Sequence, residues 1–366
     1  MREGWEYKTI ENCTSIEYGT RVVQKRDGGT IYPVYGGGGE TFRMDRYNRE
    51  DCLIIARFAM SPRCVRYVAG KFFLNDSGLS VKSKEELEQA YLNYHLLFFN
   101  DVIYHLGKGA AQRNLDVKAF RQLVIAIPPK PTQLSIVSEL DKLNELIQIK
   151  KEQLKDYDAL AQSIFYEMFG DPVVNEKGWE VKTFGDCFSI GAGGTPSTKV
   201  KEYWDNGTIP WIGSNMCQNC IITETDGKFI TEEGLNHSST KLLSPGTVLV
   251  ALVGATIGKV GLLRIETCTN QNVAFIKVQE AETFTSEFVY YHLMGLYGEF
   301  MKIGKGNFKM ANQGFIKLLP ISCPPLSLQQ SFAQKIEQIE QQKAAIQKTI
   351  TDLETLLAAR MQYWFD

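Results

Sequence analysis

The chain has 366 residues, of which 44% are hydrophobic and 22% charged, a composition typical of soluble globular proteins. It contains no apolar run of the roughly 18 residues that a membrane span requires, and its polar start does not resemble a signal peptide. Membrane, collagen-like and disordered classes are therefore excluded, and we expect a cytoplasmic protein. The formal net charge of −2 gives the whole chain no strong attraction to nucleic acid.

Residues 1–130 are expected to form the first domain. Short apolar runs broken by glycine and proline predict strands, and one helix is expected over 84–99. The charge here differs from that of the whole chain, because the stretch from Arg21 to Lys71 holds 10 basic and 5 acidic residues. This stretch is therefore basic although the chain as a whole is nearly neutral.

Residues 131–170 are expected to form a long helix, with its regular pattern over 133–169. Prolines 128, 129 and 131 are expected to precede the regular stretch 133–169, and Gly170-Asp171-Pro172 to end it. Residues 171–327 then predict a second domain of the same α+β kind, with a helix over 286–302, and residues 328–366 a second long helix. Each long helix would extend roughly 55 Å, more than one compact domain needs.

The second half of the sequence repeats the first. Trp5-Glu-Tyr-Lys-Thr-Ile returns as Trp179-Glu-Val-Lys-Thr-Phe, and Pro128-Pro129 returns 196 residues later as Pro324-Pro325. The offset grows between Ser214 and Val248, so about 18 to 20 extra residues lie there. A repeat of this length predicts two domains of one architecture.

Both long helices carry the same heptad pattern after a shift of 196 residues, which predicts that they pair with each other or with a partner. Two amphipathic helices packed on separate domains are the alternative. Lys150, Lys343 and Arg360 occupy seam positions and are expected to fix the register. The apolar seam is predicted to comprise Leu140, Leu143, Ile147, Leu154, Ile164, Ile336, Ile339, Ile346, Ile350, Leu353 and Leu357.

The sequence offers no catalytic or metal-binding motif. The runs Gly36–Gly39 and Gly191–Thr195 match neither a P-loop nor a dinucleotide fingerprint, and are interpreted as loop turns. Cys217 and Cys220 lack a second close pair of ligands, which argues against zinc, and the eight cysteines are expected to be reduced. These observations predict a chain without catalytic residues or a metal.

Loops at equivalent places in the two halves carry side chains that suit DNA. Arginine, asparagine and glutamine can form paired hydrogen bonds with base edges, and lysine beside glycine suits a phosphate. Solvated loop residues are the alternative for each one taken singly. The candidates are Arg57, Arg63, Arg66, Asn75, Asp76, Lys108 and Arg113 in the first half, and Thr256, Lys259, Asn270, Gln271, Lys305, Asn307, Lys309, Asn312 and Gln313 in the second.

Several motifs carry a resemblance to a known family. They are Gly194-Thr-Pro-Ser-Thr198, Tyr203-Trp204, Gly207-Thr-Ile-Pro-Trp-Ile212, Gly254-Ala-Thr-Ile-Gly258, Gln271-Asn272 and the exit Ser163-Ile-Phe-Tyr-Glu-Met-Phe-Gly170. Together with the two long helices, they resemble the DNA-specificity subunit of type I restriction-modification systems over essentially the whole chain. The first half departs from the commoner pattern, because it lacks the Pro-Ser and Tyr-Trp elements after Gly19-Thr20.

The resemblance implies two mixed α/β target recognition domains, each reading one half of a split, asymmetric DNA site. It implies that the two long helices form an antiparallel coiled coil, and that the whole is a pseudo-twofold internal repeat. It adds Tyr35, Thr195, Ser197 and Lys199 to the DNA-contact candidates. The implied partners are double-stranded DNA, two methylation subunits and restriction subunits, and S-adenosylmethionine, ATP and Mg would be bound by those subunits rather than by this chain.

Two other classes of function are compatible with parts of the pattern. A coiled-coil scaffold would use the same helices but bind proteins through its globular segments. An enzyme with an unrecognised site would need a nucleophile and base, or a metal cluster, that the sequence does not display.

Overall fold

A computed structural model describes residues 2–109, 112–280, 282–303 and 310–366. The chain divides into two compact units, one formed by Met1–Lys151 with Gln347–Asp366 and the other by Glu152–Ile346. Both contain helices and strands, so the predicted mixed α/β class is confirmed. Each long helix, α6 (Lys130–Phe169) and α12 (Leu326–Phe365), contributes residues to both units.

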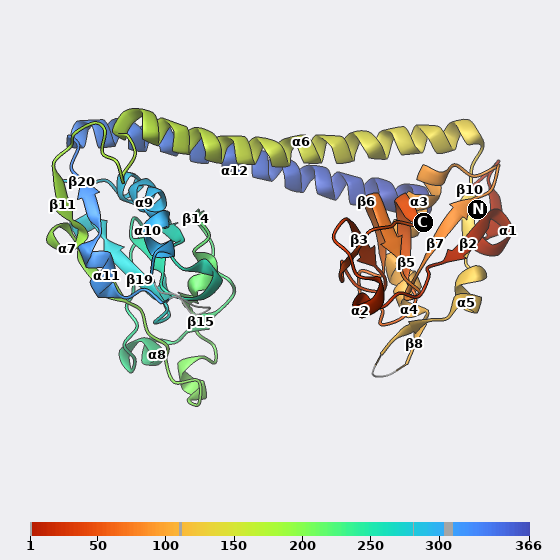
Figure 1. Cartoon of the computed structure of the whole chain (residues 1–366), viewed down its shortest axis with the longest axis horizontal. Coiled ribbons are helices and arrows are strands. Elements are labelled where there is room, and N and C mark those ends of the chain that lie inside the picture. The colour runs from red at the N-terminus through yellow and green to blue at the C-terminus, as the bar shows by residue number, and fades with distance from the viewer. Residues whose placement is uncertain (1, 110–111, 281, 304–309) are drawn as a thin grey trace. The chain divides into compact units, whose positions relative to one another are not determined.

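The first unit is built on a six-stranded sheet of order β2-β7-β5-β6-β3-β4. Its neighbours pair antiparallel except β3 and β6, which run parallel through Val34–Phe73 and Tyr35–Leu74. Figure 1 shows β5, β6 and β7 as adjacent arrows in this unit. The strands are β1 Glu6–Thr9, β2 Thr14–Tyr18, β3 Tyr32–Tyr35, β4 Arg43–Met44, β5 Arg49–Ala56, β6 Val65–Leu74, β7 Gly78–Ser83, β8 Gly107–Lys108, β9 Asn114–Leu115 and β10 Val124–Ile127.

The helices of the first unit pack on this sheet around one apolar core. Leu53 and Ile55 of β5 meet Tyr91 and Leu96 of the helix that follows the sheet, and Phe365 from the end of α12 joins them. Besides α6 and α12, the helices are α1 Ile10–Cys13, α2 Gln24–Asp27, α3 Gln89–Phe98, α4 Asn100–His105 and α5 Val117–Arg121.

The second unit has a five-stranded sheet of order β12-β19-β16-β17-β14 and a three-stranded sheet of order β15-β13-β18. Strands β14 and β15 lie within the stretch that the sequence marked as extra. The strands are β11 Val181–Thr183, β12 Ser189–Ala192, β13 Ile209–Ile212, β14 Cys220–Ile222, β15 Phe229–Ile230, β16 Val248–Ala251, β17 Val260–Leu263, β18 Cys268–Thr269, β19 Val273–Lys277 and β20 Pro320–Ser322.

Helices cover the second unit's larger sheet through an aromatic core. Phe165 and Phe169 of α6 contact Phe288 and Phe332 at ring-centroid distances of 4.8 to 5.8 Å. The α-helices are α7 Phe184–Cys187, α8 Glu232–Asn236, α9 Ser286–Gly295, α10 Tyr297–Met301 and α11 Gln313–Leu318, and the short 3-10 helices are Lys201–Tyr203, Ser214–Met216, Gly254–Thr256 and Val278–Glu280.

Within each unit, α6 and α12 lie side by side (Figure 1) and bury the same faces that the heptad pattern selects. All eleven apolar seam residues are buried or half-buried, and Ile147, for example, is 3% exposed whereas the adjacent Leu146 is 44% exposed. Two of the polar seam positions make ion pairs, Lys343 with Asp158 and Arg360 with Glu139.

Three local predictions are wrong. Pro131 lies inside α6, in the first turn, where the missing proline N–H costs no intrahelical hydrogen bond. The helix expected over 84–99 starts only at Gln89, and helix returns at Asn100 after a turn at Phe99. The helix expected over 286–302 is likewise divided, at Leu296.

Asn100 gives the physical reason for the first division. Its side chain accepts the Val65 N–H at 3.1 Å and donates to the Pro62 carbonyl at 2.7 Å. The turn at Phe99 therefore sets α4 against the loop between β5 and β6. Among the described residues, no helix combines the length and apolarity that crossing a bilayer would require.

Candidate DNA interface

In the first unit, three connections meet at one end of the sheet: the run Gly36–Gly39 after β3, the loop after β5 and the turn after β6. The Asn75 N–H donates to the Tyr35 carbonyl at 2.8 Å, and the Arg57 N–H donates to the Ser77 carbonyl at 2.8 Å. These bonds bring Tyr35, Arg57, Asn75 and Asp76 together, although they lie far apart in the sequence.

Asn75 shapes this turn with its own side chain. Its Oδ1 accepts the Ser77 N–H at 2.9 Å, and its carbonyl accepts the Gly78 N–H at 3.1 Å. Such a turn is favoured by asparagine, whose amide mimics a backbone group. The amide oxygen is therefore engaged by the fold.

The three arginines of this region differ in their surroundings. The Arg57 guanidinium lies 5.0 Å from the ring centroid of Tyr18 and 4.5 Å from that of Phe58. Arg63 is exposed. Arg66 is half-buried, and its Nη2 donates to the Gly37 carbonyl at 2.6 Å.

Lys108 and Arg113 belong to the hairpin β8–β9, which lies beside the same loop. The Met60 N–H donates to the Arg113 carbonyl, and the Leu115 N–H donates to the Arg57 carbonyl, both at 2.9 Å. The Lys108 ammonium pairs with Asp116 at 2.5 Å, and the Arg113 guanidinium lies 4.8 Å from the Tyr104 ring centroid.

The second unit builds the same turn from Asn270. Its N–H donates to the Ile212 carbonyl at 3.1 Å, and its Oδ1 accepts the Asn272 N–H at 3.0 Å. The Leu252 N–H donates to the Asn272 carbonyl at 2.8 Å, as Arg57 does to Ser77 in the first unit. Sequence reasoning placed Asn75 and Asn270 at equivalent positions, and their local hydrogen bonds agree.

The remaining candidates of the second unit that the structure describes lie on the Asn270 turn itself, on the loops after β12 and β16, and at the start of α11. Thr195 donates through its hydroxyl to Gln271 Oε1 at 2.5 Å, and the Lys259 ammonium donates to Gln218 Oε1 at 2.7 Å. Ser197 and Lys199 are exposed, on the loop after β12. Thr256 ends the 3-10 helix after β16 and donates to the Val253 carbonyl at 3.4 Å.

Asn312 and Gln313 lie at the start of α11, and Asn312 acts as its N-cap. The Asn312 Oδ1 accepts the Phe315 N–H at 2.9 Å. Asp116 caps α5 in the first unit in the same way, with Oδ1 accepting the Lys118 and Ala119 N–H groups. The candidates Lys305, Asn307 and Lys309 lie outside the described residues.

The positive charge of these loops is largely uncompensated. Of the predicted basic residues that the structure describes, only Lys108 pairs with a carboxylate. Burial lowers the pKa of Arg66, because partial removal of its guanidinium from water disfavours the charged form. An uncompensated cationic surface is what a polyanion such as DNA requires.

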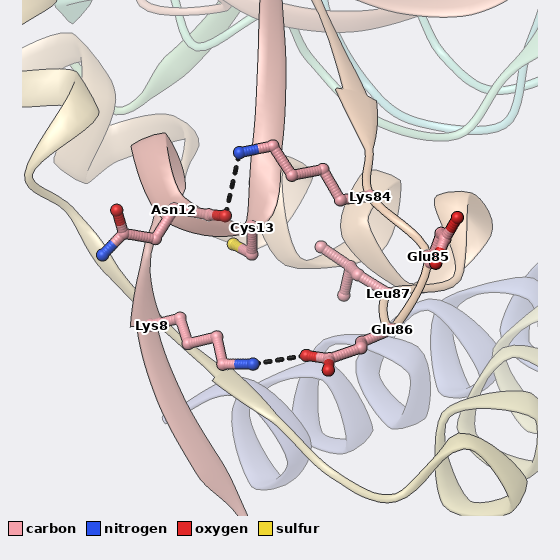
Figure 2. A pocket seen from close by; sticks show the side chains of 7 residues that line it. All are labelled: Lys8, Asn12, Cys13, Lys84, Glu85, Glu86 and Leu87. Carbon is pink, nitrogen blue, oxygen red and sulfur yellow. Dashed lines mark hydrogen bonds and ion pairs between the residues drawn. The ribbon is translucent and has the colours of Figure 1, made fainter.

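A separate hollow in the first unit is a weaker candidate for an anion (Figure 2). It is lined by Lys8, Asn12, Cys13, Lys84, Glu85, Glu86 and Leu87. The Lys8 ammonium pairs with Glu6 and Glu86, and the Lys84 ammonium donates to the Glu11 and Asn12 carbonyls at 3.1 and 2.9 Å. Both cations are thus satisfied within the fold.

The described residues contain no cluster of three or more His, Cys, Asp or Glu that could bind a metal. Cys217 is buried, and Cys220 donates to the Met216 carbonyl at 3.3 Å. Sequence reasoning missed Phe58, which is 36% exposed beside Arg57. Its place after the apolar run of β5, next to an arginine, was the available signal.

Comparison with known proteins gives one consistent result. The model of a family described as "Type I restriction modification DNA specificity domain" matches residues 2–156 and 176–355. The EcoR124I/EcoR124II specificity subunit of Escherichia coli is 23% identical over 273 residues, which are 72% of this chain and 65% of that subunit. The match therefore spans slightly less than two thirds of that relative's length.

Two further similarities extend over more of the relative. The MjaVIII specificity subunit of Methanocaldococcus jannaschii is 24% identical over 305 residues, 74% of this chain and 70% of that subunit. The crystal structure of a type I system S subunit from M. genitalium superposes with a TM-score of 0.58 at 16% identity, over 99% of this chain and 96% of that one. This structural likeness concerns the fold.

Proposed function

Because the chain belongs to the type I restriction-modification DNA specificity family, we propose that it reads a split, asymmetric DNA target and directs partner subunits to it. Each unit would act as one target recognition domain. The observation that carries this proposal is that the Asn75 turn and the Asn270 turn have the same hydrogen bonds, and that, among the described residues, the predicted basic side chains on the loops of both units, Lys108 apart, have no carboxylate partner.

The internal repeat would supply two readers of similar fold but different side chains. Arg57 and Arg63 flank the first turn, whereas Thr256 and Lys259 flank the second. Because base recognition depends on the side chains offered to the groove, we expect the two half-sites to differ. A pseudo-twofold arrangement within one chain replaces the two subunits of a dimeric reader.

The two long helices would form an antiparallel coiled coil that sets the spacing between half-sites. In the first unit, Glu139 pairs with Arg360 and Lys151 pairs with Glu354, so rising numbers on α6 meet falling numbers on α12. In the second unit Asp158 pairs with Lys343 in the same sense. The domain bounds 1–130, 131–170, 171–327 and 328–366 are part of this proposal.

Methylation and restriction would belong to partner subunits, with two methylation subunits as the expected number. S-adenosylmethionine, ATP and Mg would be bound there, and this chain would be non-catalytic. Partner subunits would also supply phosphate neutralisation that a chain of net charge −2 does not provide by itself. We propose a cytoplasmic location, where the DNA target is found.

Salt-dependent DNA binding by the full chain tests this function. Arg63→Glu and Lys259→Glu are each expected to weaken binding and to reduce the slope of log K against log salt by about 1 or more. Lys348→Glu, the same charge change on an exposed position of α12, is the matched control and should leave the slope unchanged. A protein-binding scaffold predicts equal, weak DNA binding by all four proteins, and that result would reject the proposal.

A further inference from the structure

The sequence predicts Arg66 as a base or phosphate contact, but its surroundings indicate a different use. Its Nη2 donates inward to the Gly37 carbonyl at 2.6 Å, and its Nε is buried without a partner among the described residues. The exposed Arg63, three residues earlier, makes no such inward contact with the part of the chain that the structure describes. The Arg66 side chain therefore points toward the glycine run Gly36–Gly39 rather than away from the fold.

The Gly36–Gly39 run packs closely against the loop after β5 and the turn after β6. A Cβ atom on Gly37 would overlap the Phe58 carbonyl oxygen, and one on Gly36 would overlap the side chain of Asn75. The Phe58 ring in turn lies 4.5 Å from the Arg57 guanidinium. A displacement of Gly37 would therefore move both the loop after β5 and the turn at Asn75.

The second unit supports the equivalent place by other means. Ile54 pairs with Arg66 across β5 and β6, and Leu249 pairs with Gly261 across β16 and β17, so the two registers agree after a shift of 195. Strand β14 pairs with β17 there, and Ile222 Cδ1 lies 2.6 Å from where a Gly261 Cβ would be.

The first unit has no strand at this place among its described residues, since β3 pairs with β6 only at Phe73 and Leu74. At this register the first unit has the Arg66 side chain, which bonds to the Gly37 carbonyl, and the second unit has a glycine with the Ile222 side chain against it. The equivalent residue of the second unit, Gly261, has no side chain. A supporting function of this side chain therefore belongs to the first unit alone.

We propose that Arg66 is a positioning residue of the first reading surface, which holds the Gly36–Gly39 run against Phe58 and Asn75 and does not itself contact DNA. This inference rests on the proposed function. Removal of the Arg66 guanidinium is therefore expected to reduce sequence discrimination but not the attraction to DNA phosphates.

Two measurements separate positioning from contact. In salt titrations of the full chain, Arg66→Gln should keep the wild-type slope, whereas Arg63→Gln should lower it by about 1. In cells that carry the complete system, Arg66→Gln should relax the methylated motif in one half only. Discrimination at the affected bases should fall about tenfold or more, which is the usual effect of one lost base contact. The other half of the motif is an internal control against general loss of stability.

Gly37→Ala provides an independent variant, because it disturbs the same contact without changing charge. It should relax the same half of the motif, and it decides the question if Arg66→Gln fails to fold. A lowered salt slope for Arg66→Gln, or an unchanged motif in Gly37→Ala, would overturn the inference. A wild-type chain that produces no split motif at all would instead reject the proposed function.

Discussion

The side-chain amide of Gln133 accepts a hydrogen bond from the backbone N–H of Glu88 at 2.8 Å. It also donates to the Glu86 and Pro128 carbonyls at 3.0 and 2.9 Å. Gln329 makes the equivalent three bonds in the second unit, to Thr285, Thr283 and Pro324. Each glutamine is fully buried and joins the first turn of a long helix to the N-cap of an earlier core helix, α3 or α9.

Replacement of Gln133 by alanine should therefore destabilise the first unit. The change removes three hydrogen bonds and leaves backbone groups without partners, at a cost of about 2 to 4 kcal/mol. Chemical denaturation of the full chain measures it, with Gln148→Ala as the control because Gln148 is exposed on the same helix. Equal stability of the two variants would show that the buried amide does not anchor α6.

Alanine substitutions at two adjacent residues of α6, one buried in the seam and one exposed, should differ in their effect on the free energy of unfolding. Ile147→Ala should cost about 2 to 4 kcal/mol because the side chain is almost fully buried, whereas Leu146→Ala should change the free energy of unfolding by less than about 0.5 kcal/mol. Urea denaturation of both variants checks this. Similar values for both would contradict the predicted helix pairing.

The buried side chain of His95 should make the folded state less stable in acid. Burial lowers its pKa to about 4, and its Nε2 accepts the Ala126 N–H at 3.4 Å. Because the unfolded state binds a proton below about pH 6.5 and the folded state does not, stability should fall as pH drops from about 6.5 toward 4. Denaturation at about pH 7 and about pH 5 should show a smaller loss in His95→Gln than in the wild type. An identical loss in both would assign the acid sensitivity to other groups.

Replacement of Gly254, in the loop after β16, should strain the backbone. Its φ of 72° is a left-handed conformation that alanine adopts with strain, so Gly254→Ala should destabilise by about 1 kcal/mol even though the space is open. Gly298→Ala, in the helix α10 and also in open space, should instead be neutral or stabilising. Thermal denaturation distinguishes the two variants, and a lower melting temperature is expected for Gly254→Ala only.

The sequence predicted those features that depend on period or repetition. The seam of α6 and α12 follows from a seven-residue period, and the equivalence of Asn75 and Asn270 follows from the repeat. It did not predict that the backbone N–H of each asparagine bonds to the end of a distant strand, because that depends on strand ends meeting through β3–β6 and β13–β18 pairing. Gln133 and Gln329 were missed, although two identical polar residues after matching proline pairs carried the signal.

Arg66 shows most clearly what the sequence alone does not predict. Its residue type predicts DNA contact, whereas its side chain bonds to the carbonyl of Gly37, 29 residues earlier in the chain. No local pattern encodes that proximity.

Under the proposed function, this chain determines which split DNA sequence is methylated. Modified-base sequencing of host DNA, with the gene intact and with it deleted, measures this directly. We predict that deletion removes one asymmetric, split methyladenine motif and leaves other methylation unchanged. An identical methylation map in both strains, in a host whose methylation subunits are active, would contradict the account.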